Sequence, residues 1–239
     1  RYVSAKFKLL KNQSKQSLCF VKKDDSLIKK GLKSTKIKSK IIKVDTNKYQ
    51  KLFDYKKNEY FLTEANKENL LFVLAITKKF KLNKQILFNT IQKFKGLKYR
   101  QQIVYKDTNL TIINDSKSTS FSSSIGILKN NPNIYWLLGG VYKKGDKFKL
   151  QKRYYHNIKA FVFGKKRNFF NNQLKGKINV ENFDNLKDAF KKVLTLTKKQ
   201  KFVKKTILFS PSAASFDSFS NFEDRGQYFN RLIKDYLNG

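Results

Sequence analysis

The chain has 239 residues, of which 40% are hydrophobic, and it carries 53 Lys and Arg residues against 17 Asp and Glu, for a formal net charge of +36. This composition excludes a disordered chain, because it can bury a core in one large or two modest domains. The one cysteine, Cys19, excludes a disulfide framework and a thiolate metal cluster, and the sequence contains no apolar run of 18 residues that would predict a membrane span. We therefore expect a cytoplasmic protein that buries Cys19 and does not contact membranes.

The excess of basic residues has two interpretations. A basic domain gains affinity for nucleic acids from phosphate contacts and from the release of counterions. However, only six of the 53 basic residues are Arg, whose planar fork suits phosphate recognition, and the Lys residues occur in pairs along the whole chain. We favour a lysine-rich composition spread over the surface, and we expect no nucleic-acid partner.

The first 95 residues predict three helices and three short strands. The helices are predicted at residues 1–12, 64–80 and 84–93. The strands are predicted at residues 17–21, 36–44 and 60–63, and the last two are expected to be antiparallel or at a sheet edge. A lysine-rich turn region is expected after Asp24 and Asp25, and Gly96 breaks the pattern at a predicted domain boundary.

From residue 96 onward, strands and helices alternate. Strands are predicted near residues 102–105, 110–113, 134–138, 160–163, 177–180 and 205–209. Helices are predicted near residues 121–130, 149–156, 184–199 and 223–237. Such alternation indicates an α/β domain with a mostly parallel sheet that is flanked by helices.

Residues 111–120, TIINDSKSTS, predict the functional edge of this sheet. Apolar β-branched residues end a buried strand, and the chain then places a carboxylate, an ammonium group and hydroxyls just before a helix, which suits a phosphate or carboxylate ligand. Two later strands end in similar loops, at residues 139–144 and 210–216. Because the carboxyl ends of parallel strands share one edge, we expect the three loops to converge on one crevice.

An ordered set of short motifs resembles the Mur ligase family and, within it, the branch that adds D-glutamate. The motifs are YVSAK at residues 2–6, NKEN at 66–69, GLKYR at 96–100, NDSKST at 114–119, LGG at 138–140 followed by Lys143, and SPSAASFD at 210–217 with NFEDRG at 221–226. The resemblance covers essentially the whole chain. It implies that residues 1–95 are the C-terminal part of a central ATP-binding domain and that residues 96–239 form a C-terminal Rossmann-like domain.

The resemblance also implies a reaction. ATP would phosphorylate the L-alanyl carboxylate of UDP-N-acetylmuramoyl-L-alanine, and the amine of D-glutamate would attack the acyl phosphate to form an amide in peptidoglycan synthesis. This chemistry needs cations around the transferring phosphoryl group and a site that orients two carboxylate-bearing reactants. ATP and Mg²⁺ are the implied cofactors, and we expect a monomer whose partners are these small molecules.

The resemblance assigns five residues to catalysis and to ATP. Lys6, as a carbamate, would bind Mg²⁺ through its oxygen atoms, and Lys117 would lie near the phosphates or the incoming amino acid. Asn69 would contact the adenine, Arg100 the phosphates and Asp115 the ribose. From the residues alone, Lys6 could equally be a solvated helix lysine and Asp115 a turn former.

The implied D-glutamate pocket consists of Thr119, Lys143, Ser215, Phe216 and Phe222. One ammonium group and two hydroxyls can hold two carboxylates, and the main-chain N–H groups of Phe216 and Phe222 are further donors. The simpler alternatives are core aromatics for the two Phe residues and a helix cap for Ser215.

The chain departs from the family pattern without losing a charged group that the mechanism needs. Ala65 and Tyr99 stand where the family has His, Ser120 replaces Asn, and Ser212 replaces Cys. Lys144 remains an alternative to Lys143 as the carboxylate contact.

No G-x-x-G-K-[ST] phosphate loop occurs in the sequence. In the family this loop, the catalytic glutamate and the uridine-nucleotide domain precede the position of Lys6. We therefore expect the chain to correspond to the C-terminal half of a longer ligase and to lack turnover by itself. A sister amino-acid ligase of the folylpolyglutamate type is a further alternative, although the NDSK and NFEDRG motifs favour the D-glutamate branch.

Overall fold

The computed structural model describes residues 2–47, 54 and 57–238. The chain divides into two compact units, Arg1–Phe94 and Lys95–Gly239, each with hydrophobic clusters of its own. Among the described residues, no helix is both long enough and apolar enough to cross a membrane.

The first unit begins with a β-α-β arrangement. Helix α1 (Tyr2–Lys11) precedes strand β1 (Leu18–Lys22), helix α2 (Ser26–Ser34) and strand β2 (Lys40–Val44). The two strands are parallel, with Leu18 opposite Lys40, so the antiparallel alternative predicted for residues 36–44 was wrong. Each strand has one neighbour in this two-stranded sheet and therefore lies at an edge, as the other alternative held. Helix α2 occupies the predicted turn region: Asp25 caps it by accepting the Ile28 N–H at 2.9 Å, and the helix carries the chain back to start a parallel strand.

The elements described within residues 57–94 are all helical. The strand predicted at residues 60–63 is instead the 3₁₀ helix η2 (Glu59–Leu62), because Asn58 accepts the Tyr60 N–H and donates to the carbonyls of Ile91 and Phe94 at 2.8 Å each. The apolar residues of this turn then pack on α4 (Glu64–Lys79) and α5 (Lys84–Lys93), both as predicted.

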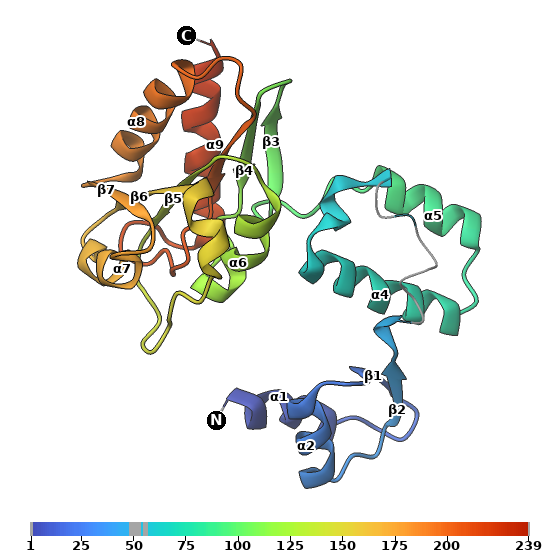
Figure 1. The fold of residues 1–239 in the computed structure, drawn as a ribbon. Coiled ribbons are helices and arrows are strands. Elements are labelled where there is room, and N and C mark those ends of the chain that lie inside the picture. Colours follow the sequence, from blue (N-terminus) through green and yellow to red (C-terminus); the bar gives the residue numbers. More distant parts are fainter. Residues whose placement is uncertain (1, 48–53, 55–56, 239) are drawn as a thin grey trace. The chain divides into compact units, whose positions relative to one another are not determined.

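Six strands form one sheet in the second unit, in the order β3-β4-β8-β5-β6-β7 (Figure 1). They are β3 (Gln102–Lys106), β4 (Leu110–Asn114), β5 (Ile134–Gly139), β6 (Ile158–Phe163), β7 (Asn179–Phe183) and β8 (Lys205–Phe209). Every neighbouring pair is parallel except β3 and β4. The prediction of a mostly parallel sheet is confirmed.

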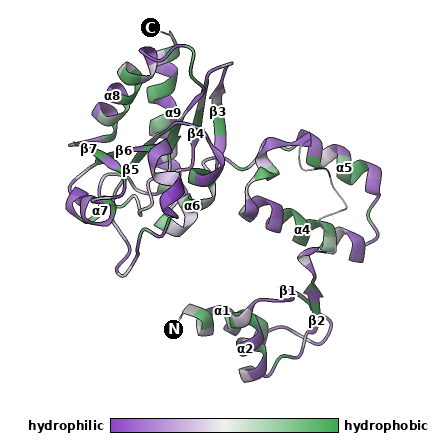
Figure 2. Ribbon diagram, in the orientation of Figure 1, coloured by the Kyte–Doolittle hydropathy of each residue, from purple (hydrophilic) through white to green (hydrophobic). Residues whose placement is uncertain are grey.

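Helices cover both faces of this sheet. Helices α6 (Phe121–Asn130) and α7 (Arg167–Leu174) pack on one face, and α8 (Leu186–Lys198) and α9 (Phe222–Asn238) on the other (Figure 1). Side chains of β5 alternate between the two hydrophobic clusters, with Trp136 in one and Leu137 in the other. Accordingly, the hydropathy colouring shows apolar strands between helices of mixed character (Figure 2).

Two elements of this unit differ from the prediction. The helix predicted at residues 149–156 is only a 3₁₀ turn, η3 (Lys152–Asn157). Helix α7 was not predicted, because its short, Asn-rich sequence buries only Phe170 and Leu174 and so carries little periodic signal.

The strand order makes the carboxyl ends of β4 and β8 a place where a ligand crevice is expected. These strands are neighbours, yet β4 leads into α6 on one face of the sheet and β8 leads into α9 on the opposite face. Where the connections of two adjacent parallel strands diverge in this way, the loops leave an opening outside the strand ends, and ligands bind in such openings.

Candidate active site at the carboxyl ends of strands β4, β5 and β8

Asp115 and Ser210 join the ends of β4 and β8. The last paired residues are Asn114 and Phe209, and the ladder continues with a 2.7 Å hydrogen bond from the Asp115 N–H to the Phe209 carbonyl. One carboxyl oxygen of Asp115 accepts the Ser210 hydroxyl at 2.8 Å, and the other accepts the Gln101 N–H at 3.1 Å. Burial raises the pKa of Asp115 to about 7, against the opposing effect of these bonds and of the nearby Arg100.

A buried network of hydroxyls extends from this carboxylate. Ser124 Oγ on α6 lies 2.7 Å from the hydroxyls of Ser210 and Ser212 and 2.8 Å from that of Ser118. While Asp115 is ionised it only accepts, so Ser210 donates to Asp115 and Ser124 donates to Ser210. Ser118 and Ser212 must then both donate to Ser124. The network therefore has one direction, and it ties the loops after β4 and β8 to α6.

Arg225 of α9 holds the same two loops from the opposite face. Its side chain is only 1% exposed. Nε donates to the Ser116 hydroxyl at 3.1 Å, and Nη2 donates to the carbonyls of Ser116 and Ala213 at 2.8 and 2.9 Å. Burial lowers the pKa of Arg225 to about 10, while Asp217 and Asp115 favour its charged form. The guanidinium thus fixes the backbone next to Lys117 and near Ser215.

The cation of Lys117 lies on an aromatic ring. Its Nζ is 3.6 Å from the centroid of the Phe222 ring at the start of α9, and the Phe222 carbonyl accepts the Ser116 hydroxyl at 2.8 Å. The Lys117 N–H donates to the Tyr99 carbonyl at 3.0 Å. Main chain and side chain are therefore both anchored, and the ammonium group is held beside the start of α9.

The segment around Arg100 docks onto α9 and β4. Tyr99 and Gln101 both have left-handed backbone, with φ of 60° and 49°, so the exposed Arg100 lies between two strained residues. The Tyr99 ring fills the space beside Gly226, where a Cβ atom would lie 2.4 Å from the ring. A side chain at position 226 would therefore displace the Tyr99 ring and disturb the segment that carries Arg100.

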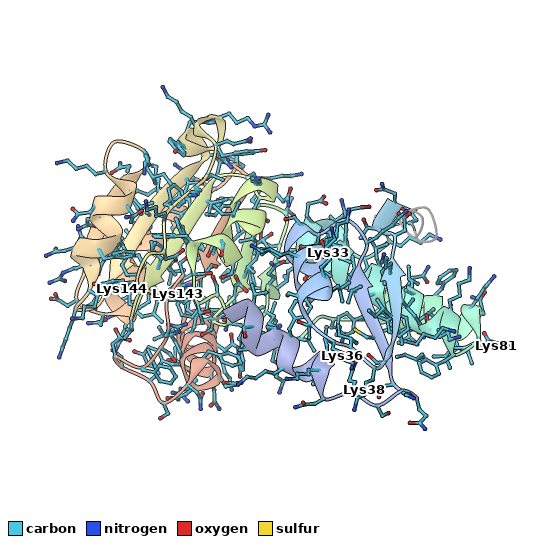
Figure 3. The ribbon with its side chains drawn as sticks, turned by 90° about the horizontal axis from the view of Figure 1, so that it is seen from below. Lys33, Lys36, Lys38, Lys81, Lys143 and Lys144 are labelled. Carbon is cyan, nitrogen blue, oxygen red and sulfur yellow. The ribbon has the colours of Figure 1, made fainter. Side chains whose placement is uncertain are left out.

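The loop after β5 is tied to its surroundings at several points. Val141 forms a two-way backbone bridge with Ala214, at 2.9 Å in each direction. The Tyr142 ring stacks on Phe169 with centroids 3.9 Å apart. The adjacent Lys143 and Lys144 are exposed and project from this loop (Figure 3).

Eight of the ten predicted residues belong to the second unit. Seven of them lie on the three converging loops or at the start of α9: Asp115, Lys117, Thr119, Lys143, Ser215, Phe216 and Phe222. Contacts among these loops confirm the predicted convergence. Arg100 lies next to Gln101, which binds Asp115.

Burial of the predicted residues is uneven. Asp115 and Ser215 are buried, Lys117 and Phe222 are half-buried, and the remaining four in this unit are exposed, Phe216 by 74%. Lys6 on α1 and Asn69 on α4 are exposed residues of the first unit. Exposed lysines such as Lys33 and Lys81 project from that unit as well, so the basic residues are not confined to the crevice (Figure 3).

Three residues that support the site were not predicted from the sequence. Arg225 stood inside a quoted motif without a role, and its burial could not be foreseen from a residue that is usually exposed. Ser124 is one of several serines on α6, and nothing local marks it as the centre of the network. Asp146 lies three residues after Lys143 and directly follows Gly145. A glycine at this position is a turn signal, and it could have pointed to Asp146.

The side chains do not by themselves fit a divalent cation. Within residues 2–47, 54 and 57–238, no group of three or more His, Cys, Asp or Glu side chains could hold a metal ion. Lys6 offers nitrogen and not the oxygen ligands that Mg²⁺ requires. A Mg²⁺ site at Lys6 would therefore depend on a modified side chain and on further ligands.

Most of the chain aligns with curated relatives. The chain is 35% identical over 170 residues to the UDP-N-acetylmuramoylalanine–D-glutamate ligase of Wolbachia sp. subsp. Brugia malayi, covering 71% of this chain and 34% of the relative. It is 34% identical over 189 residues to the enzyme of the same name from Francisella philomiragia, covering 77% and 44%. The chain is a Mur ligase homologue. It spans about a third to less than half of the length of these relatives.

Solved structures of Mur ligases share the fold. The UDP-N-acetylmuramate–alanine ligase of Thermotoga maritima matches with a TM-score of 0.50 and 16% identity, over 74% of this chain and 38% of its own. The murein peptide ligase of Psychrobacter arcticus matches with a TM-score of 0.57 and 8% identity, over 99% of this chain and 54% of its own. No family model matches the chain.

Proposed function

We propose that the chain is part of an ATP-dependent ligase that adds D-glutamate to UDP-N-acetylmuramoyl-L-alanine through an acyl phosphate in peptidoglycan synthesis. The observation that carries the proposal is the convergence of the loops bearing Lys117, Lys143 and Ser215, in a homologue of enzymes named for this reaction. We place the protein in the cytoplasm as a monomer whose partners are its small-molecule reactants.

The D-glutamate pocket is assigned to the side of the crevice between β5 and β8. Lys143 and Thr119 supply an ammonium group and a hydroxyl, and Ser215 supplies a second hydroxyl beside the Val141–Ala214 bridge. Together they suit an amino acid that carries two carboxylates. Phe216 and Phe222 contribute main-chain N–H groups, which accounts for the exposure of the Phe216 ring.

The nucleotide contacts of the second unit are assigned to Arg100 and Asp115. Arg100 binds phosphates and Asn69 the adenine, while Asp115 is proposed as the ribose contact. The buried Asp115 carboxyl also orients Gln101, the neighbour of Arg100, through the 3.1 Å hydrogen bond. Lys117 is assigned to the phosphates or the incoming amino acid, because a cation stabilises charge on a transferring phosphoryl group.

Lys6 is proposed to act as a carbamate that binds Mg²⁺. Carbamylation would replace the Lys6 cation by an anionic group whose oxygen atoms can bind Mg²⁺. Mass spectrometry of the intact protein in bicarbonate buffer should show the added carbon dioxide on Lys6, and Lys8 on the same helix is the matched reference.

Phosphate release tests the proposed reaction. The complete polypeptide encoded by the gene is supplied with ATP, Mg²⁺ and UDP-N-acetylmuramoyl-L-alanine, and D-glutamate, L-glutamate or a diamino acid is added in turn. Release that requires D-glutamate is the expected result. Release with another amino acid would instead assign the protein to a sister ligase, and the absence of release with all of them would reject the ligase assignment.

We expect the 239 residues alone not to turn over. The curated relatives are more than twice as long as the part that this chain matches, and the phosphate loop is absent from this sequence. Phosphate release above background by the isolated 239-residue chain would contradict this expectation.

A further inference from the structure

Asp146 connects the loop after β5 to the start of helix α6. Its carboxylate accepts the Phe121 N–H at 2.8 Å, although the two residues are 25 positions apart. Phe121 is the first residue of α6, and the preceding Ser120 makes no side-chain cap bond to the helix. A carboxylate from another loop thus serves as the cap, where both the free N–H and the helix dipole favour it.

The same residue closes a tight turn on Lys143. The Asp146 N–H donates to the Lys143 carbonyl at 3.0 Å, and Gly145 between them has a φ of 79°. A four-residue turn with left-handed backbone at its third position needs glycine there. In this turn Lys143 is at the base and Lys144 is at the corner, so the two lysines are not equivalent.

Asp146 therefore sets the separation between Lys143 and Thr119. Thr119 lies two residues before the N–H that Asp146 accepts, and Lys143 lies three residues before Asp146 itself. On the other side, Val141 is joined to Ala214, the neighbour of Ser215. One hydrogen-bonded carboxylate and one backbone bridge thus connect three groups of the proposed D-glutamate pocket.

We propose that Asp146 is a positioning residue that determines specificity for the second carboxylate of the amino-acid substrate. In this assignment the cation that contacts the carboxylate is Lys143 and not Lys144. This assignment rests on the proposed function. Without the cap the turn is released from α6, and Lys143 no longer has a fixed distance to Thr119. Binding of a neutral side chain depends less on that distance, so discrimination should fall more than overall activity.

The test compares D-glutamate with D-glutamine in the complete polypeptide. Asp146→Ala should reduce the kcat/KM ratio of D-glutamate over D-glutamine by about tenfold or more, mainly through the KM for D-glutamate, with the KM for ATP unchanged. Asp146→Asn keeps an oxygen acceptor for the Phe121 N–H and should retain most of the discrimination. Lys144→Ala is the matched control for charge in the loop, and it should leave the discrimination between D-glutamate and D-glutamine unchanged.

Amide hydrogen exchange supplies a readout that does not need activity. In the 239-residue chain, the Phe121 amide should exchange faster in Asp146→Ala than in the unsubstituted protein, and Asp146→Asn should restore its protection. Unchanged exchange at Phe121 in Asp146→Ala would overturn the assignment, because the cap would then have no effect.

The remaining outcomes separate the two proposals. An unchanged amino-acid preference in Asp146→Ala, or an equal loss with both amino acids and with ATP, would overturn the role of Asp146 and leave the proposed function standing. If the unsubstituted polypeptide shows no turnover that depends on D-glutamate, the proposed function fails, and the assignment of Asp146 fails with it.

Discussion

The ammonium nitrogen of Lys117 lies 3.6 Å from the centroid of the Phe222 ring, so a residue of the loop after β4 is held by the first residue of α9. The sequence suggested only a main-chain role for Phe222. The ring adds a second one, because its face attracts the cation and limits the positions that Lys117 can take.

Removing this ring should reduce activity without unfolding the protein. In the complete polypeptide, Phe222→Leu keeps the main-chain N–H but removes the aromatic face. The contact is worth about 0.5–2 kcal/mol, so kcat/KM should fall about 2-fold to 30-fold. Phe216→Leu is the matched control, since the Phe216 ring is 74% exposed and should be dispensable. Equal losses in the two variants would contradict the role of the Phe222 ring.

Arg225→Lys should destabilise the second unit. A lysine cannot reproduce the three hydrogen bonds to Ser116 and Ala213, and it leaves buried carbonyls unsatisfied. We expect a loss of about 2–4 kcal/mol in the free energy of unfolding. Urea unfolding followed by the fluorescence of Trp136, the single tryptophan, measures it, because the Trp136 Nε1–H donates to the Ser210 carbonyl beside the site.

The exposed Arg231 provides the control for this substitution. It lies on the same helix α9, so Arg231→Lys should change the free energy of unfolding by less than about 0.5 kcal/mol. An unfolding midpoint of Arg225→Lys as high as that of Arg231→Lys would show that the buried guanidinium does not hold the loops.

Two glycine-to-alanine substitutions should change the free energy of unfolding in opposite directions. Alanine favours helices over glycine by about 1 kcal/mol, so Gly126→Ala on α6, where nothing lies within 4 Å of the added Cβ, should stabilise the protein. Gly226→Ala on α9 should destabilise it by about 1–3 kcal/mol, because the Cβ would lie 2.4 Å from the Tyr99 ring.

Truncating Tyr99 tests the cause of that loss. Tyr99→Gly removes the ring and also suits the left-handed backbone at this position, where φ is 60°. In the Tyr99→Gly background, Gly226→Ala should therefore be neutral or stabilising. If Gly226→Ala lowers the free energy of unfolding equally with and without Tyr99→Gly, the added Cβ does not act through the Tyr99 ring.

The stability of the second unit should fall as the pH rises from about 4 to about 7. The pKa of Asp115 is raised from 3.8 to about 7 by burial, so the folded state keeps a proton that the unfolded state loses in this window. The stabilisation is complete below pH 4 and is lost as the pH passes through 7. Urea unfolding by Trp136 fluorescence at several pH values should show the decline.

Asp115→Asn isolates this effect. Asparagine has nearly the shape of the protonated carboxyl and does not titrate, so the decline between pH 4 and pH 7 should be much smaller in the variant. Asp107 at the other end of β4 does not account for the decline, because backbone hydrogen bonds lower its pKa and its contribution is lost only in more acidic solution. The same decline in the variant and in the unsubstituted protein would exclude Asp115 as its source.

The sequence by itself determined the six strands of the second unit and the sheet edge that carries the candidate site. Strands such as β5 are continuous apolar runs, and each ends abruptly in glycine, serine or charged residues. These signals are local, because a buried strand and the turn that ends it are both encoded in neighbouring residues. The motif resemblance then selected the candidate residues on those loops.

Tertiary structure alone decided which groups meet. The placement of β8 between β4 and β5 brings Ser210 to Asp115, and it depends on which face of the sheet each helix covers. Likewise, the parallel pairing of β1 and β2 followed from α2, which a lysine-rich sequence did not reveal. Buried polar partners such as Arg225 and Ser116 are 109 positions apart, and the benefit of pairing them arises only once the surrounding chain has excluded water.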